Sequence, residues 1–298
     1  MKKILKGISF FAVMIMLVGS LVACSGSTED KKDKADKADK ADKADKEESV
    51  DTSLKGTLTM AGSTSMEKLA NIAAEAFMIK YPNVIVSPEF VGSSAGVEQV
   101  IAGAVNIGNA SRALKDSEIE SGAVENVVAI DGIGVITDNS NTVNNISKEE
   151  LIGLFTGTIS NWSQLGGPNQ PVVVVGRESG SGTRGAFEEI LGVEDQCVYS
   201  NEINSTGGVM AKVASTPGAI GYVSLDILND TVRAFKLEGV EPTSDNIKAG
   251  DYFLSRPFVM ATKGEISEQN ELVQEFFNYL YSAEGKDLIE SVGLIAVD

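Results

Sequence analysis

A glycine- and hydroxyl-rich stretch at residues 176–187 (GRESGSGTRGAF) is the part of the sequence best suited to bind an anion. It follows a strand-like run at 171–175 (PVVVV) and leads into a helical spacing of apolar residues that ends at Leu191. Small residues at a strand-to-helix turn leave the first helical amides free, and these amides bind anions with the help of the helix dipole. Arg177 adds a planar guanidinium that suits an oxyanion. Taken alone, a helix capped by a hydroxyl explains the same residues.

Two further turns have the same character. Residues 61–66 (AGSTSM) follow a strand-like run at 57–60, and residues 92–96 (GSSAG) follow a strand-like segment that begins at Val84. Each turn leads into a helical pattern. In α/β sheets ligands bind beyond the carboxyl ends of strands, where helices begin. The three turns and Arg177 together predict a cradle of amides and hydroxyls around one oxyanion.

The composition restricts the chemistry that such a cradle could perform. The 298 residues include no histidine, which excludes Ser-His-Asp and Cys-His catalysis and His-ligated zinc. We therefore expect a binding protein and not an enzyme. The formal net charge of −17 argues against a nucleic-acid partner. It also means that local dipoles and a few arginines must hold any anion.

The N-terminal part resembles an export signal followed by a tether. Residues 1–23 combine three early lysines with a short apolar run at 10–18, and we predict a lipoprotein signal peptide. Residues 21–24 (LVAC) resemble the bacterial lipobox, in which Cys24 is lipidated and becomes the mature N-terminus. An ordinary secretory signal followed by a chance cysteine is the alternative. Residues 24–53 contain an Ala-Asp-Lys repeat of nearly balanced charge and have few apolar residues besides alanine, which predicts a disordered charged tether.

The rest of the chain alternates strand-like and helical patterns, which predicts an α/β fold with mostly parallel sheets flanked by helices. Two helix starts show the spacing of a capping box, Thr64 with Glu67 and Ser147 with Glu150. Residues 225–250 form a polar, irregular excursion. Further strands are expected at 219–223 and 257–261, and helices at 66–80, 147–155, 272–281 and 285–291.

A carboxylate interrupts the apolar run at residues 127–137 (VVAIDGIGVIT). A buried Asp131 is costly unless it has a partner, so its place in the run suggests a function. The alternative is a turn at Asp131 and Gly132 between two short strands, with the carboxylate in solvent.

The chain resembles the PstS-type phosphate-binding lipoproteins of bacterial phosphate ABC importers. The motifs that carry the resemblance are AGSTSM (61–66), VGSSAGVEQV (91–100), IGNASR (107–112), AIDGIGVI (129–136), SKEELIGLFTGTISNW (147–162), GRESGSGTRGAF (176–187), PGAIGYVS (217–224) and SRPFVM (255–260). The resemblance implies a two-lobed periplasmic-binding-protein fold of type II with two crossover strands and a ligand in the cleft between the lobes. Lobe I would comprise residues 54–132 and 256–298, and lobe II residues 133–255.

The resemblance also implies which residues bind phosphate. The set carried over or expected from the motifs is Thr64, Ser65, Ser93, Ser111, Arg112, Asp131, Arg177, Ser181, Gly182 and Thr183. One position departs from the family pattern, because many members have an aspartate where this chain has Ser111 and Arg112. That aspartate accepts a proton from phosphate and repels sulfate, which carries no proton at neutral pH. Asp131 is the candidate replacement, and Glu178 is the second, although Glu178 is better suited to orient Arg177 or to face solvent.

The expected function is that of a phosphate receptor on the outer face of the cell membrane. It would be a lipid-anchored monomer without a cofactor, and would deliver inorganic phosphate to the permease and ATPase subunits of an ABC transporter. A receptor for another tetrahedral oxyanion, such as sulfate or molybdate, is the nearest alternative. A phosphatase with a serine nucleophile and a surface lipoprotein without a ligand are the more distant ones.

Overall fold

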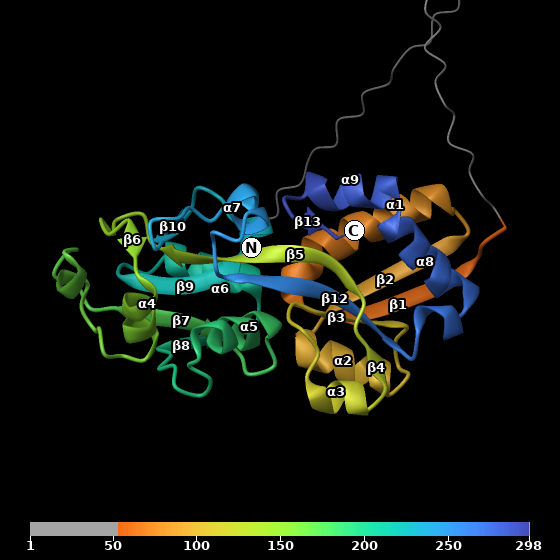
Figure 1. Ribbon diagram of the computed structural model, residues 1–298, viewed down its shortest axis with the longest axis horizontal. Coiled ribbons are helices and arrows are strands. Elements are labelled where there is room, and N and C mark those ends of the chain that lie inside the picture. The colour runs from red at the N-terminus through yellow and green to blue at the C-terminus, as the bar shows by residue number, and fades with distance from the viewer. Residues whose placement is uncertain (1–52, 298) are drawn as a thin grey trace, which may run out of the picture. The chain divides into compact units, whose positions relative to one another are not determined.

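The computed structural model describes residues 53–297, which fall in one compact unit. The predicted signal peptide, the predicted lipidation site at Cys24 and nearly all of the predicted tether lie outside these residues. Among the helices of residues 53–297, none is both long and apolar enough to cross a membrane. The elements form two groups that two long strands connect (Figure 1).

The first group is built on three parallel strands in the order β2-β1-β3. Figure 1 shows α1, α8 and α9 on one side of these strands, and α2 and α3 on the other. The predicted C-terminal helices face this core, since Phe276, Phe277 and Leu280 are buried against Phe77 of α1 and its neighbours. The elements of this group are β1 (Gly56–Gly62), η1 (Thr64–Met66), α1 (Glu67–Lys80), β2 (Val84–Phe90), α2 (Ser93–Ile101), β3 (Ile107–Ala110), α3 (Asp116–Glu120), β4 (Ala123–Val124), η4 (Ile266–Glu268), α8 (Glu271–Tyr281), α9 (Ala283–Ser291) and β13 (Ile295–Ala296).

The second group is built on parallel strands in the order β9-β7-β8. Its core includes Trp162, which is fully buried, stacks on Phe235 and donates from Nε1 to the carbonyl of Gly218. The elements are β6 (Asn145–Ile146), α4 (Lys148–Phe155), η2 (Trp162–Leu165), β7 (Val173–Arg177), α5 (Gly182–Leu191), β8 (Asn201–Ile203), α6 (Thr206–Ala214), β9 (Ala219–Ser224), η3 (Leu225–Ile227), β10 (Arg233–Ala234), β11 (Lys236–Leu237) and α7 (Ser244–Lys248).

Two long antiparallel strands, β5 (Val127–Thr137) and β12 (Ser255–Lys263), connect the groups. Strand β12 pairs with β3 on one side and with β5 on the other, and β5 pairs in turn with β9. Strand β5 continues without a break through Asp131 and Gly132, so the alternative of a turn at this point is wrong. The expected α/β fold with helices flanking the sheet and two crossover strands is confirmed. The expectation of mostly parallel strands holds only within the core of each group, because β5 and β12 pair antiparallel with each other and with their neighbours and make the sheet mixed.

The local predictions held with two exceptions. Ser147 and Glu150 form the predicted capping box of α4. The box predicted for Thr64 and Glu67 is wrong, because Ser63 caps the short η1 helix and the Thr64 hydroxyl contacts other groups. Residues 225–250 are less irregular than expected, since they include η3, β10, β11 and α7. The predicted lobe boundaries stay a prediction.

Candidate functional site: an oxyanion cradle

Helices from both groups begin at one place, and their first residues form the candidate site. Strand β1 leads through Ser63 into η1 and α1, and β7 leads through a turn at residues 178–181 into α5. Helices α2 and α6 begin beside them, as the contacts below establish. Gly62, at the end of β1, has a φ of 148°, and a Cβ there would lie 2.0 Å from the Asn109 carbonyl oxygen. The first turn can therefore approach β3 only with glycine at this position.

Hydroxyl groups connect the starts of α1, α5 and α6 across the two groups. The Ser65 Oγ lies 2.7 Å from Thr183 Oγ1 and 2.8 Å from Thr206 Oγ1. The Thr64 Oγ1 lies 3.0 Å from the same Thr206 atom. All four side chains are buried. Because each hydroxyl can donate or accept, the set can exchange these mutual bonds for bonds to an anion.

Serines close the other side of the cradle. Ser63 Oγ donates to Ser111 Oγ at 2.8 Å, and Ser111 N donates to Ser93 Oγ at 3.2 Å. A Cβ at Gly182 would lie 2.4 Å from Ser93 Oγ and 2.7 Å from Ser111 Oγ. Glycine at the start of α5 therefore lets the helix amides approach these hydroxyls closely. Ser181 caps α5 by accepting from Arg184 N, and its own O–H group remains available as a donor.

Arg177 supplies the charge of the cradle. Its side chain is 1% exposed, and its two terminal nitrogens donate to Thr206 Oγ1 at 3.0 Å and to Thr64 Oγ1 at 3.1 Å. Glu178 accepts from Nε at 3.0 Å and from Nη2 at 2.9 Å. The expectation that Glu178 orients Arg177 is thus confirmed. The guanidinium is fixed on one edge by the Glu178 carboxylate and by the Ile203 carbonyl, to which Nε donates at 3.0 Å, and its other edge faces only hydroxyls.

A hydrogen-bonded pair of tyrosines, Tyr222 fully buried and Tyr199 half-buried, supports the backbone of Arg177. The Arg177 amide donates to Tyr222 Oη at 3.3 Å, Tyr222 contacts Tyr199 Oη at 3.1 Å, and Tyr199 donates to Glu188 at 2.7 Å. Burial raises the pKa of both tyrosines, so both remain neutral donors and acceptors. The strand end that carries Arg177 is therefore held independently of the ligand.

Arg112 is engaged elsewhere. Its Nη1 and Nη2 donate to the two carboxylate oxygens of Glu118 at 2.8 and 2.7 Å, and Nη1 also donates to the Ala113 carbonyl. Burial alone would raise the pKa of Glu118, but the bonds from Arg112 and the Lys115 amide lower it below its usual value. The arrangement is a bidentate ion pair next to the cradle serines.

Asp131 pairs with Arg256 on the neighbouring crossover strand. Its Oδ2 accepts from Arg256 Nε at 3.1 Å and from Nη2 at 2.9 Å, and both side chains are about 1% exposed. Arg256 Nη1 donates to the Ser111 carbonyl at 3.1 Å. Burial raises the pKa of Asp131, although the charge of Arg256 opposes that shift. Within residues 53–297 Asp131 makes no hydrogen bond to a cradle hydroxyl, and it reaches the cradle through Arg256.

Known proteins can be compared with this arrangement. A family model described as a PBP superfamily domain matches residues 47–284. Phosphate-binding protein PstS from Bacillus subtilis (strain 168) is 36% identical over 248 residues, which cover 81% of this chain and 81% of that protein. This chain belongs to the PstS family. A second member, from Borreliella burgdorferi, is 25% identical over 252 residues and is covered to 90% of its length.

Solved structures give the same assignment for the fold. A phosphate ABC transporter substrate-binding protein with bound phosphate from Clostridium perfringens matches with a TM-score of 0.78 and 38% identity, over 82% of this chain and all of that one. An ABC-type phosphate transport receptor from Vibrio cholerae matches with a TM-score of 0.69 and 33% identity. The two groups of elements are thus the two lobes of the periplasmic-binding-protein fold.

Two cradle residues of this PstS family member escaped the sequence analysis. Thr206 starts α6 and bonds to Arg177, Thr64 and Ser65. Ser63 was quoted within its motif but not selected. A hydroxyl directly before a helix of small residues, as in STGG at 205–208, was the available signal. In the described part of the chain, no cluster of three or more acidic or cysteine side chains is arranged to hold a metal ion.

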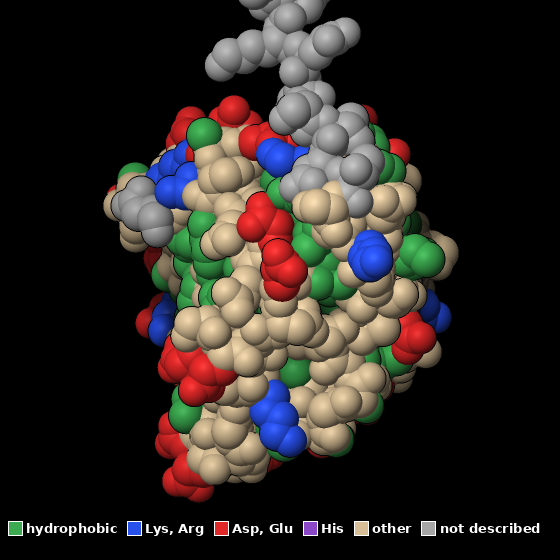
Figure 2. All heavy atoms as spheres, turned by 90° about the vertical axis from the view of Figure 1, so that its right-hand side faces the viewer, with side chains coloured by type: hydrophobic (Ala, Val, Ile, Leu, Met, Phe, Trp, Pro, Cys, Tyr) green, Lys and Arg blue, Asp and Glu red, His purple; other side chains and the backbone are tan. Residues whose placement is uncertain are grey.

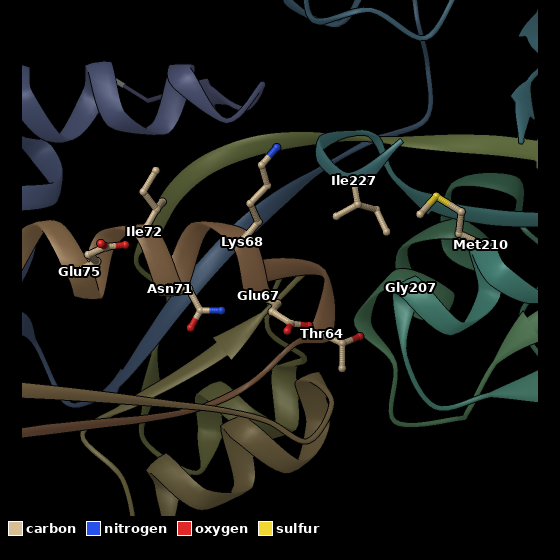
Figure 3. Close-up of a pocket in the computed structure, with 9 residues that line it drawn as sticks. All are labelled: Thr64, Glu67, Lys68, Asn71, Ile72, Glu75, Gly207, Met210 and Ile227. Atoms are coloured by element: carbon tan, nitrogen blue, oxygen red, sulfur yellow. The ribbon is translucent and has the colours of Figure 1, made fainter. Parts of the chain in front are cut away.

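A surface pocket of about 580 Å³ adjoins the cradle, since Thr64 is one of the residues that line it. Figure 3 shows residues that line this pocket, with Thr64 and Lys68 on the first lobe and Met210 and Ile227 on the other. Figure 2 shows acidic and basic side chains interspersed over one face of the first lobe. Local donors therefore matter more for an anion here than the negative net charge of the chain.

Proposed function

We propose that this protein is the solute-binding component of a phosphate ABC importer, and that it binds inorganic phosphate in the cradle and delivers it to the permease. The observation that carries the proposal is the buried Arg177, whose free edge faces hydroxyls from both lobes. A desolvated guanidinium among hydroxyl and amide donors suits a tetrahedral oxyanion. The related proteins named for phosphate binding support the choice of phosphate.

The proposed phosphate ligands are those that meet in the cradle. They are Thr64, Ser65, Ser93, Ser111, Arg177, Ser181, Gly182 and Thr183, to which we add Thr206. Because the ligands come from both lobes, bound phosphate would stabilise the closed arrangement, and release would require hinge opening. Arg112 remains a weaker candidate, since Glu118 occupies both of its terminal nitrogens.

Lipid attachment at Cys24 would anchor the protein to the extracytoplasmic face of the membrane. The protein would act there as a monomer. The tether at residues 24–53 would let the folded unit reach the permease, which works with its ATPase subunits. These finer proposals come from the lipobox-like residues 21–24 and from the family resemblance. Labelling cells with a clickable fatty acid, with a Cys24→Ala variant as the control, tests the anchor.

Calorimetric titration of the folded protein with phosphate, arsenate and sulfate tests the ligand. We expect tight binding of phosphate and arsenate, and weak or no binding of sulfate. Equal binding of sulfate would favour a general oxyanion receptor, and no binding of any of the three would contradict the proposal. The role of Asp131 in rejecting sulfate stays a prediction, and an Asp131→Asn variant that keeps phosphate affinity and still rejects sulfate would exclude it.

A further inference from the structure

A cluster of buried polar atoms without partners lies between the crossover strand β5 and the end of β9. The atoms are Asp131 Oδ1, Ser224 Oγ and both carboxylate oxygens of Asp226, and none of them makes a hydrogen bond of normal length and angle within the described residues. The Ser224 hydroxyl nevertheless lies close enough to interact with both carboxylates. The three side chains are 2%, 0% and 8% exposed. Buried polar atoms without partners are rare because each costs free energy of desolvation. The cluster therefore calls for a ligand that supplies hydrogen bonds.

The charges around Asp226 come from three other elements. Asp131 on β5 is the nearest like charge, while Arg256 on β12 and Lys68 on α1 are the opposite charges. Arg256 directs two bonds to Asp131 and none to Asp226. Lys68 Nζ donates to the backbone carbonyls of Asp226 at 2.7 Å and of Val292 at 3.2 Å, not to the carboxylate. The carboxylate of Asp226 thus lies beside a second carboxylate, and the Ser224 hydroxyl, which interacts with both, makes a well-formed hydrogen bond to neither.

One proton satisfies this cluster. Two neighbouring buried carboxylates do not both ionise readily, so one of them tends to hold a proton. A protonated Asp226 can donate to Ser224 Oγ, and the Ser224 hydroxyl can then donate to Asp131 Oδ1. These two hydrogen bonds give partners to three of the four unpaired atoms. Sodium or potassium fits less well, because no group of three or more acidic or cysteine side chains among the described residues is arranged to hold a metal ion.

We propose that Asp226, Ser224 and Asp131 form a proton-binding site that fills when the lobes close on phosphate. The inference rests on the proposed phosphate-binding function. The site adjoins the cradle, because Arg256 also binds the Ser111 carbonyl and Lys68 lies one turn after Thr64 on the same helical segment. In Figure 3 Lys68 extends from α1, while Ile227 marks the η3 segment that carries Asp226 on the other lobe. A proton taken up here offsets negative charge next to a bound phosphate anion.

The direction of the pH dependence follows from the same environment. Burial, followed by the charge of Asp131, raises the pKa of Asp226 from 3.8 to about 7 in this closed arrangement, although Ser224, Lys68 and Arg256 oppose the shift. Opening the cleft would admit water and return the pKa toward its ordinary value. Closure then takes up a proton between these two pKa values. The stabilisation is fully present below the lower pKa and is lost as the pH rises through about 7.

Titration calorimetry of phosphate binding in buffers of different ionisation enthalpy counts the protons taken up. We compare the wild type with Asp226→Asn at several pH values between 5 and 8, a window that follows from the linkage of proton uptake to binding. Phosphate's own protonation contributes equally to both proteins, so the difference isolates Asp226. We expect the wild type to take up about one proton more, and its affinity relative to the variant to change by up to about tenfold per pH unit. Asp230→Asn, at an exposed aspartate of the same lobe, should match the wild type.

Several outcomes would overturn the inference. Equal proton uptake by the wild type and by Asp226→Asn, with phosphate binding intact in both, would overturn the inference. Failure of the wild type to bind phosphate would instead contradict the proposed function. Dependence of the affinity on sodium or potassium, compared with choline at equal ionic strength, would assign the site to a cation. If Asp226→Asn does not fold, infrared difference spectra of the wild type decide. A protonated-carboxyl band that appears with phosphate supports the site, and its absence overturns it.

Discussion

Arg177 and Arg256 are both almost completely buried, but their partners differ in kind. Arg256 donates from Nε and Nη2 to one oxygen of Asp131, and from Nη1 to the backbone carbonyl of Ser111. Arg177 has a carboxylate on one edge only, and the side chain of that carboxylate, Glu178, is 32% exposed. The other edge of Arg177 faces Thr64 and Thr206. One arginine has a fixed buried partner, and the other has partners that an anion can replace.

The difference indicates when a buried arginine can serve a ligand. Separating a buried arginine from its carboxylate partner would leave two buried charges without compensation. The Asp131–Arg256 pair is therefore part of the scaffold. Hydroxyls carry no charge, and they can turn from the guanidinium to an incoming oxyanion. Arg112 belongs with Arg256 by this criterion, because Glu118 takes both of its terminal nitrogens. Burial alone would not have separated the three arginines.

The largest effect is expected from breaking the scaffold pair. Arg256→Met leaves Asp131 buried without its partner, and should lower the free energy of unfolding by about 3–5 kcal/mol. Urea denaturation followed by the fluorescence of Trp162, the only tryptophan, measures this change. The double variant Asp131→Leu/Arg256→Met should recover part of the loss, because no unpaired charge remains. A single variant that loses less than about 1 kcal/mol would place Arg256 outside the scaffold.

Removing the charge of the cradle should come next in size. Arg177→Met eliminates charge-assisted bonds worth roughly 1.5–3 kcal/mol each, so phosphate affinity should fall by about 10²–10³-fold. Titration calorimetry measures the change, and thermal unfolding checks that the variant remains folded. Arg112→Gln tests the weaker candidate and should change the affinity by no more than about threefold, because Glu118 occupies both terminal nitrogens of Arg112. Thermal unfolding checks this variant too, because it leaves the carboxylate of Glu118 without its partner. A larger effect at Arg112 than at Arg177 would invert the comparison.

The smallest effect is expected from removing one of the hydroxyl partners of Arg177. Thr206→Val keeps the shape of the side chain and removes its hydroxyl, at a cost of about 1 kcal/mol of binding free energy, or about fivefold in affinity. Thr158→Val, at an exposed position of the same lobe, should have no measurable effect on calorimetric titration with phosphate. An unchanged affinity for Thr206→Val would mean that Thr206 stabilises the closed lobes without contacting the anion.

The sequence by itself determined the local structure and the character of the site. Strand-like runs and helical spacings predicted most elements, and the Ser147 cap formed as expected, because such signals depend on neighbours within a few residues. The motif at 176–187 predicted an anion site with Arg177 at its centre, and the structure gives Arg177 hydroxyl partners from both lobes. The absence of histidine excluded the commonest catalytic arrangements before any fold was known.

Only the tertiary structure decided which distant residues meet. Asp131 finds Arg256 at a separation of 125 residues, because β12 pairs antiparallel with β5 in the register that places them opposite each other. Thr64 contacts Thr206 at a separation of 142 residues, which is why it does not cap its own helix. No local pattern encodes such pairs: a shift of one residue in strand register would turn Asp131 to the other face of the sheet.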